Sequence, residues 1–327
     1  MPVSSADTPR PPFSYVDAAH LRDAVSDRKA VDLLRSALST DHADLIDRTP
    51  RTHTELTSGE FLLMPAEIDG YAGVKVATVA PHNPAAGRPR IQGTYVLFTA
   101  DHLQPVALVD AAELTLIRTP AVTTLAIQGI LAADPAGPRG SVGQVVVIGT
   151  GPQAERHARS LAANVTVGDV VILGRRPDAA RALVDTLTQS GLPARPGRPS
   201  DLRDSDVVIC ATSSTTPVFA DDQVGPDTVV AAMGAHGLTR REVPPELVLR
   251  ADVVVESVES ALRESGDLIP ARTAEEWRRH GLVTLPDLVR GSYRRTPGRP
   301  ALFTSVGMGW EDLVIAAAGY ESGLHAR

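Results

Sequence analysis

A glycine-rich turn near the middle of the chain holds the first residues whose types and spacing could do chemistry. The apolar run QVVVI at residues 144–148 leads into GTGPQA at residues 149–154, and an alanine-rich helix is predicted to follow. Gly149 permits a tight turn, Gly151 lets the backbone approach a pyrophosphate, and Ala154 allows close helix packing. The amino end of that helix adds free N–H groups and a positive dipole. We therefore predict a dinucleotide cofactor here; the alternative is a plain glycine turn.

The end of the next predicted strand bears on which dinucleotide is bound. An acidic residue there would bind the ribose 2′-hydroxyl of NAD, whereas arginines suit the 2′-phosphate of NADP. This chain has Gly174, Arg175 and Arg176 at that point and no acid. The sequence favours NADP(H) over NAD(H). NAD(H) stays open because arginine is common throughout this chain.

Three cationic residues outside that region could bind a carboxylate. Lys75 stands inside an apolar strand pattern, although only two of the 32 basic residues are lysine, and burying it without an anion would be costly. Arg118 comes just before a predicted helix start, with Thr119 as the N-cap and Pro120 as the first helical residue. Arg51 lies in a predicted loop. Each residue alone also fits a surface or capping role, whereas a substrate carboxylate would account for all three.

Other polar residues are assigned by their position after predicted strands. His236 follows the strand TVVAAMGA, and its ordinary pKa suits either proton donation or a simple cofactor contact. Thr212 and Ser213 are predicted to face the cofactor. Cys210 is interpreted as a buried, inert thiol and His157 as a packing residue. The histidines show no metal-ligand spacing, so no metal site is predicted.

The elements that position these residues fall into two regions. Residues 15–38 have helical spacing of apolar side chains, and residues 54–116 contain strand patterns, the last of them PVALVDAAELTLI. Beyond residue 138, short continuous Val/Ile runs alternate with helices, as in strands buried on both faces of a parallel sheet. The sequence predicts an α/β fold with a Rossmann-type doubly wound domain over residues 120–300 and a flexible tail over residues 1–14.

Composition narrows the class of protein. The chain has 327 residues, enough for about two domains, and 39 acids against 32 bases give a net charge of −7. An acidic balance argues against nucleic acid or an anionic membrane as the partner. A single cysteine excludes an intrachain disulfide. No uninterrupted apolar run reaches the length of a membrane span, and no signal pattern stands at the N-terminus, so we expect a cytoplasmic protein with a small-molecule substrate.

Five motifs in this order resemble the ornithine cyclodeaminase/mu-crystallin family: IRTPAVTTLA, VVVIGTGPQAERHARSL, MGAHGLTRREV, ESALRESGDL and LFTSVGMGWEDL. The resemblance covers residues 15–320. It implies an NAD(P)-dependent enzyme acting at the carbon between an amine or imine and a carboxylate. It also implies a homodimer in which residues 15–119 and 301–327 form a split α+β domain for substrate binding and dimerisation.

Matched by motif position, Arg51, Lys75 and Arg118 correspond to the family's substrate-carboxylate ligands. Lys75 and His236 are the predicted catalytic residues. The residues expected to contact the cofactor are Gly149, Thr150, Gly151, Pro152, Gln153, Ala154, Arg175, Arg176, Thr212, Ser213, Gly234, Val306, Gly307 and Met308.

Departures from the family pattern bear on the reaction. Ornithine-active members carry an Asp after the fifth strand and an acid before the Met-Pro pair, where this chain has the AHG run around His236 and the apolar Leu62. Thr304 replaces a lysine that many members have. We therefore predict an NAD(P)H-dependent reductase of a 2-imino acid, with cyclic imines as the preferred substrates. An amino-acid or opine dehydrogenase, a cyclodeaminase and a small-ligand binding protein remain alternatives.

Overall fold

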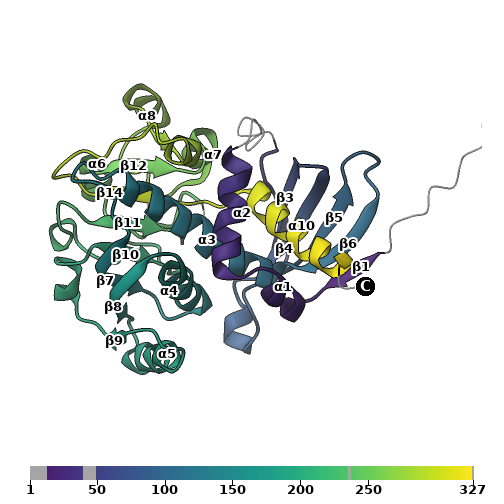
Figure 1. Ribbon diagram of the computed structural model, residues 1–327, viewed down its shortest axis with the longest axis horizontal. Coiled ribbons are helices and arrows are strands. Elements are labelled where there is room, and N and C mark those ends of the chain that lie inside the picture. The colour runs from purple at the N-terminus through teal and green to yellow at the C-terminus, as the bar shows by residue number, and fades with distance from the viewer. Residues whose placement is uncertain (1–12, 40–48, 235–236, 326–327) are drawn as a thin grey trace, which may run out of the picture.

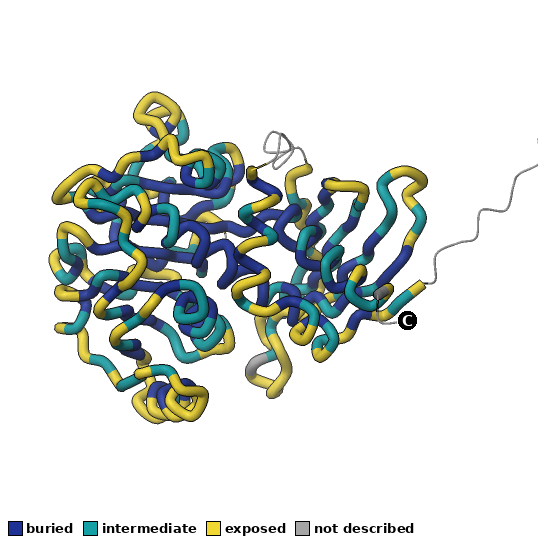
Figure 2. Tube along the Cα trace, viewed as in Figure 1, coloured by how far each residue is buried: buried dark blue, intermediate teal, exposed yellow. Residues whose placement is uncertain are grey.

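Two β-sheets lie side by side, and one long helix runs from one to the other (Figure 1). The computed structural model describes residues 13–39, 49–234 and 237–325. The strands of both sheets and the helices between them consist largely of buried residues, whereas the outer loops are exposed (Figure 2). The α/β fold predicted from the sequence is confirmed, with a parallel Rossmann-type sheet in one half.

The first sheet has six strands in the order β1-β6-β5-β4-β3-β2, and only β1 and β6 pair in parallel. Helix α10 (Gly309–His325) covers one face of it (Figure 1). Buried Met64, Lys75 and Tyr95 are cross-strand neighbours on the inward face. The strands are β1 (Ser14–Val16), β2 (Thr52–Leu56), β3 (Gly59–Ile68), β4 (Tyr71–Val79), β5 (Ile91–Thr99) and β6 (Pro105–Asp110).

The N-terminal region differs from its prediction. The apolar spacing over residues 15–38 predicts helix throughout, but Tyr15 lies in β1, and the rest forms α1 (Ala18–Ala24) and α2 (Asp27–Ser39). Asp17 ends the strand and caps α1, because its side chain accepts a hydrogen bond from the His20 backbone N–H at 2.8 Å. Most of the predicted tail lies outside the described residues.

The second sheet has eight parallel strands in the order β13-β12-β14-β11-β10-β7-β8-β9. The order reverses between β7 and β10, which is where doubly wound sheets bind ligands. The strands are β7 (Ser141–Ile148), β8 (Thr166–Leu173), β9 (Ala194–Pro196), β10 (Val207–Cys210), β11 (Val229–Ala232), β12 (Asp252–Val255), β13 (Val283–Thr284) and β14 (Ala301–Thr304).

Helices and short 3-10 turns connect these strands, and their apolar faces pack on the sheet. The helices are α4 (Pro152–Asn164), α5 (Pro177–Gln189), α6 (Pro245–Arg250), α7 (Val258–Glu264), α8 (Ala274–His280) and α9 (Leu285–Val289). The 3-10 turns are η3 (Pro199–Leu202) and η4 (Asp221–Gln223), and η2 (Asn83–Ala86) lies between β4 and β5. The last strand, β14, pairs with β11 on one side and β12 on the other, so it belongs to the parallel sheet. The end of the Rossmann-type domain therefore lies after β14 and not at residue 300.

The long helix α3 (Ala111–Ala132) corrects two predictions. The strand region does not continue to residue 116, and the helix does not begin at Pro120 with Thr119 as its N-cap. It begins after Asp110, whose carboxylate accepts the Glu113 backbone N–H at 2.8 Å, and Pro120 lies inside the helix. Arg118 is therefore a helical residue. Its helix is apolar and long enough to span a membrane, but 78% of that stretch is buried inside the protein, which accounts for its apolar sequence.

Candidate active site

The structure brings together the three cations that the sequence singles out, each from a different element. Lys75 comes from β4, Arg118 from α3 and Arg51 from the segment before β2. Lys75 and Arg118 are 3% and 5% exposed, so neither is a surface cation. Gly307 lies against the guanidinium of Arg118, and Arg51 donates to the Gly307 carbonyl. The cluster predicted from separate weak signals is thus one site in space.

Each cation of this cluster already contacts a carboxylate of the protein. The Nζ of Lys75 lies 2.7 Å from Oδ2 of Asp312. The Nη1 of Arg118 lies 2.8 Å from Oε2 of Glu311, and its Nε lies 3.3 Å from Asp312. Both acids belong to the first turn of α10 and are fully buried. Sequence reasoning missed these partners, although the adjacent Glu and Asp of GMGWED were the available signal.

Arg51 links the two halves of the molecule. Its Nε lies 2.8 Å from Oε2 of Glu264, at the end of α7, and its Nη2 donates to the carbonyls of Val306 and Gly307. The loop holding these carbonyls is fixed in turn by Glu256, whose carboxylate accepts the Val306 backbone N–H at 3.0 Å. Arg51 therefore joins the segment before β2 to the nucleotide-binding half.

Burial and neighbouring charge shift the pKa values in opposite directions. Burial lowers the pKa of Lys75 to about 8, and the Asp312 carboxylate only partly offsets this. Burial also opposes charge on Arg118, but the carboxylates of Asp312 and Glu311 prevail and raise its pKa. Burial, together with the nearby Glu256 carboxylate, raises the pKa of Glu311 far above its usual range despite the contact with Arg118.

The glycine loop has the geometry that a pyrophosphate needs. Gly149 has a φ of +136°, and a Cβ there would collide with the carbonyl of Ala211. Gly151 caps α4 with no side-chain hydrogen bond, and a Cβ on it would meet nothing within 4 Å. The amino end of α4 thus offers unpaired N–H groups beside open space at the break in strand order. These residues fit a dinucleotide.

One residue of α3 connects the cation cluster to this loop. The Nζ of Lys75 donates to Oγ1 of Thr115 at 3.4 Å, and the side-chain amide of Gln153 donates to the Thr115 carbonyl at 3.3 Å. Gln153 belongs to the first turn of α4. The predicted substrate ligands and the predicted cofactor loop therefore meet at Thr115, and carboxylate and dinucleotide would be bound side by side.

Comparison with known proteins identifies the family. Residues 17–326 match the ornithine cyclodeaminase/mu-crystallin family. The chain belongs to this family.

Two relatives and one solved structure show how similar its members are. Delta(1)-pyrroline-2-carboxylate reductase of Bacillus cereus is 30% identical over 273 residues, 80% of this chain and 81% of that protein. The Delta(1)-pyrroline-2-carboxylate/Delta(1)-piperideine-2-carboxylate reductase of Azospirillum brasilense is 30% identical over 78% of each chain. The structure of a probable ornithine cyclodeaminase from Bordetella pertussis is 28% identical, with a TM-score of 0.83 over 96% of this chain and 98% of that one.

The residues predicted from their positions after strands to contact the cofactor lie at the carboxyl edge of the parallel sheet. Arg175 and Arg176 are exposed just beyond β8, and Ser213 is exposed beyond β10. The hydroxyl of Thr212 donates to Glu242 at 2.6 Å, so the structure gives it a protein partner. His236, the predicted proton donor, lies outside the described residues.

Two residues interpreted as structural have structural surroundings. His157 is fully buried, its Nδ1 lies 2.7 Å from the Gln153 carbonyl, and burial lowers its pKa to about 4. Cys210 is fully buried, which raises the pKa of its thiol. Within the described part of the chain, no group of three or more His, Cys, Asp or Glu side chains is placed to hold a metal ion.

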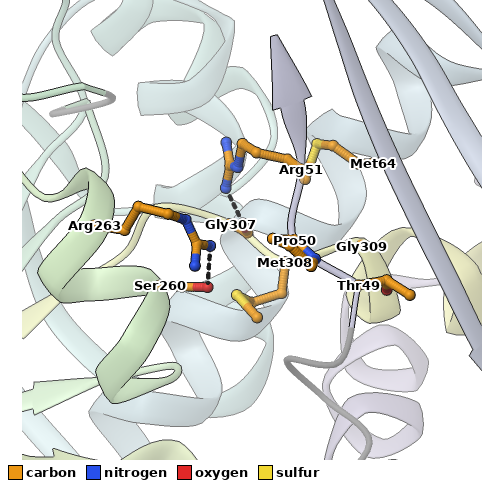
Figure 3. A pocket seen from close by; sticks show the side chains of 9 residues that line it. All are labelled: Thr49, Pro50, Arg51, Met64, Ser260, Arg263, Gly307, Met308 and Gly309. Atoms are coloured by element: carbon orange, nitrogen blue, oxygen red, sulfur yellow. Dashed lines mark hydrogen bonds between the residues drawn. The ribbon is translucent and has the colours of Figure 1, made fainter.

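A cleft lies beside Arg51, between the segment before β2 and helix α7. Figure 3 shows Arg51 and Arg263 reaching it from different elements, with Met308 between the two halves. Its volume is about 230 Å³, part of it open to solvent. Met64 lines the cleft, whereas Leu62, the apolar residue at the position of the family's acid, does not. The lining residues are Thr49, Pro50, Arg51, Met64, Ser260, Arg263, Gly307, Met308 and Gly309.

Proposed function

We propose that the protein is an NAD(P)H-dependent reductase of a 2-imino acid, with the cyclic imines of proline and pipecolate size as preferred substrates. The observation that carries the proposal is the double contact of Thr115, which touches Lys75 of the cation cluster and Gln153 of the cofactor loop. A carboxylate held by the cluster would leave its neighbouring carbon beside the dinucleotide. The two pyrroline-2-carboxylate reductases described above, which are relatives of this chain, support this substrate class.

The chain's own residues would bind and orient the substrate. A carboxylate between Lys75, Arg118 and Arg51 would be held by charge-assisted hydrogen bonds, and the guanidinium groups favour two-point contact. When bound, NAD(P)H supplies the hydride. Because burial lowers the pKa of Lys75 to about 8, its Nζ holds a proton at neutral pH that it gives up readily. His236 remains the predicted proton donor to the imine nitrogen.

NADP(H) is the proposed cofactor. Arg175 and Arg176 follow β8, where a 2′-phosphate would lie in a doubly wound fold, and neither makes a salt bridge among the described residues. Both side chains are exposed and so can meet a phosphate without displacing a protein carboxylate.

A homodimer is the proposed assembly. The outward face of the six-stranded sheet carries an unbroken apolar row in register across five strands: Tyr15, Leu108, Val96, Val74 and Pro65. Tyr15 is 68% exposed and the other four are partly exposed. A contiguous apolar surface of this kind is typical of an interface. Sedimentation of Val74→Glu should show the loss of a dimer that the unmodified protein forms.

The test of the proposed reaction is the oxidation of NADPH and NADH, followed at the nicotinamide absorbance. Pyrroline-2-carboxylate and piperideine-2-carboxylate serve as substrates, and ornithine with NAD serves as the alternative. We expect imine-dependent NADPH oxidation that Lys75→Ala abolishes. Conversion of ornithine to proline with ammonia release, and no turnover of either imine, would overturn the proposal.

A further inference from the structure

A buried glutamate ties together two strand ends beside the cofactor loop. Glu242 is fully buried, and its Oε1 accepts the backbone N–H of Thr212 at 2.7 Å and the Thr212 hydroxyl at 2.6 Å. Its Oε2 accepts the backbone N–H groups of Met233 at 3.1 Å and Gly234 at 2.6 Å. Thr212 follows β10, and Met233 and Gly234 follow β11. One carboxylate therefore satisfies four donors from two neighbouring strand ends.

A second carboxylate extends this connection to a third strand. Oδ1 of Asp267 accepts the backbone N–H of Glu242 at 2.7 Å and that of Val243 at 3.2 Å. The hydroxyl of Thr304, the last residue of β14, donates to Oδ2 of Asp267 at 3.4 Å. Asp267 is 1% exposed. We call Glu242 and Asp267 the carboxylate clamp.

The backbone is built to fit this clamp. A Cβ on Gly234 would collide with the Thr212 carbonyl and come within 2.8 Å of the Glu242 carboxyl group. The two loops are therefore closer together than any larger residue would allow. Burial raises the pKa of Glu242 to about 7 and that of Asp267 to about 6, so two carboxyl groups are kept here against a desolvation cost.

The clamp lies next to the glycine loop. Gly149, just after β7, packs on the carbonyl of Ala211. Ala211 immediately precedes Thr212, which donates two hydrogen bonds to Glu242. β7 and β10 are adjacent strands, at the break in strand order. A change in the position of the Thr212 backbone would therefore reach the surface that receives the dinucleotide.

We propose that Glu242 is a positioning residue that holds the ends of β10 and β11 in the shape required for dinucleotide binding. The inference rests on the cofactor part of the proposed function. Glu242 acts through the backbone of Thr212, Met233 and Gly234. Fixed backbone groups lose little freedom when the cofactor binds, so the clamp increases affinity without contacting the cofactor.

The test compares this clamp with a matched carboxylate at the opposite edge of the same sheet. Asp206 accepts the backbone N–H groups of Gly143 at 2.6 Å and Gln144 at 3.1 Å, at the amino ends of the strands. Glu242→Gln and Asp206→Asn each replace a carboxylate by an amide of the same shape, so each leaves some N–H donors unpaired. The measurements are the dissociation constants of NADPH and NADH, the melting temperature, and hydrogen exchange of the Thr212, Met233 and Gly234 amides.

We expect Glu242→Gln to raise the dissociation constant of the dinucleotide about tenfold or more and to speed exchange of those amides. Asp206→Asn should lower the melting temperature but keep the dissociation constant within about twofold, because it acts at the far edge. Equal cofactor affinity in Glu242→Gln and the unmodified protein would overturn the clamp alone. An unmodified protein that binds neither dinucleotide would overturn the proposed function as well.

Thr212→Val gives a second, milder variant should Glu242→Gln fail to fold. It removes the hydroxyl, which donates to Glu242 and accepts the Ser214 backbone N–H at 3.1 Å, but it keeps the backbone bond to Glu242 and preserves the side-chain shape. We expect its dissociation constant to rise about threefold to tenfold, with a slower rate of amide exchange than in Glu242→Gln. An unchanged constant in this folded variant would count against the proposal.

Discussion

At the glycine loop the space beside Gly151 is open and the first turn of α4 has no side-chain cap, whereas in the cation cluster every positive side chain already contacts a protein carboxylate. The difference follows from burial. Backbone N–H groups at a helix end can face solvent until a ligand arrives, but Lys75 and Arg118 are buried, and a buried cation without a partner would be very costly. On the proposed function, a dinucleotide would meet free N–H donors at the glycine loop, whereas a substrate carboxylate would compete with protein carboxylates in the cation cluster.

The largest effect should come from removing one member of a buried pair. Lys75→Met removes the shorter of the two ion pairs of buried Asp312 and leaves only Arg118, 3.3 Å away, so we expect the free energy of unfolding to fall by about 3–5 kcal/mol and imine turnover to be lost. The double variant Lys75→Met with Asp312→Asn removes both charges. It should recover most of the stability and none of the turnover, as measured by urea unfolding and by NADPH oxidation.

This pair of variants separates folding from function. Recovery of turnover in the double variant would mean that Lys75 serves only to neutralise Asp312. The cation cluster would then differ from the glycine loop in a simpler way: Lys75 would stabilise the fold and would not bind the substrate carboxylate.

Two glycines of the cofactor loop should respond in opposite ways. Gly149→Ala places a Cβ at a φ of +136° and against the Ala211 carbonyl, so we expect it to cost about 1–3 kcal/mol of stability. Gly151→Ala has room for its methyl group and should change stability by less than about 0.5 kcal/mol. The same methyl group stands where a pyrophosphate would approach, so dinucleotide affinity should fall about tenfold.

Thermal unfolding and cofactor titration on both variants check this prediction. Unchanged affinity in Gly151→Ala would mean that the open space beside the loop is not where the pyrophosphate binds.

The parts of the molecule that the sequence predicts well are local in the chain. The glycine loop lies within six consecutive residues, and the parallel strands appear as continuous apolar runs because both of their faces are buried. The grouping of Arg51, Lys75 and Arg118 came from the family resemblance together with the chemistry of a carboxylate. The acids that pair with them could not be predicted, since Asp312 and Lys75 are far apart in the sequence and meet only because α10 returns to the first sheet.

The start of α3 shows how a strong local signal can mislead. Thr119 followed by Pro120 has the pattern of a helix start, yet Asp110 caps the helix one residue before Ala111. Proline inside a helix loses one backbone hydrogen bond. Burial of nearly the whole helix between the two sheets offsets that loss, and burial of this kind is decided by tertiary packing. The clamp residues Glu242 and Asp267 were missed for the same reason.

Substrate binding should weaken at alkaline pH because of Lys75. Its pKa is about 8 in the folded protein against 10.5 for an ordinary lysine, so the folded state loses this proton first. Between these two values the unfolded state binds more protons, so this residue makes the protein more stable as the pH rises. Carboxylate affinity changes in the opposite sense, falling about tenfold per pH unit above pH 8.

Pyrrole-2-carboxylate is a suitable probe because its ring nitrogen does not titrate in this range. Its inhibition constant should be flat from pH 6 to pH 7.5 and rise above pH 8. The double variant at Lys75 and Asp312 should show weak inhibition with no such rise. A constant that does not change up to pH 9.5 in the unmodified protein would exclude Lys75 as a carboxylate ligand.

The smallest expected effect concerns the choice between NADPH and NADH. It involves only exposed residues near the glycine loop and none of the buried cation cluster. Arg175 and Arg176 are exposed, so a 2′-phosphate would gain only a solvent-screened contact from each, worth about 1 kcal/mol or less. Replacing either by Ala should raise the dissociation constant of NADPH about threefold to fivefold and leave that of NADH unchanged. Arg181→Ala is the matched control, since Arg181 is also exposed but pairs with Asp178 on α5. Equal losses for both dinucleotides would indicate general electrostatic attraction, and the preference for NADP would then have no basis in these two residues.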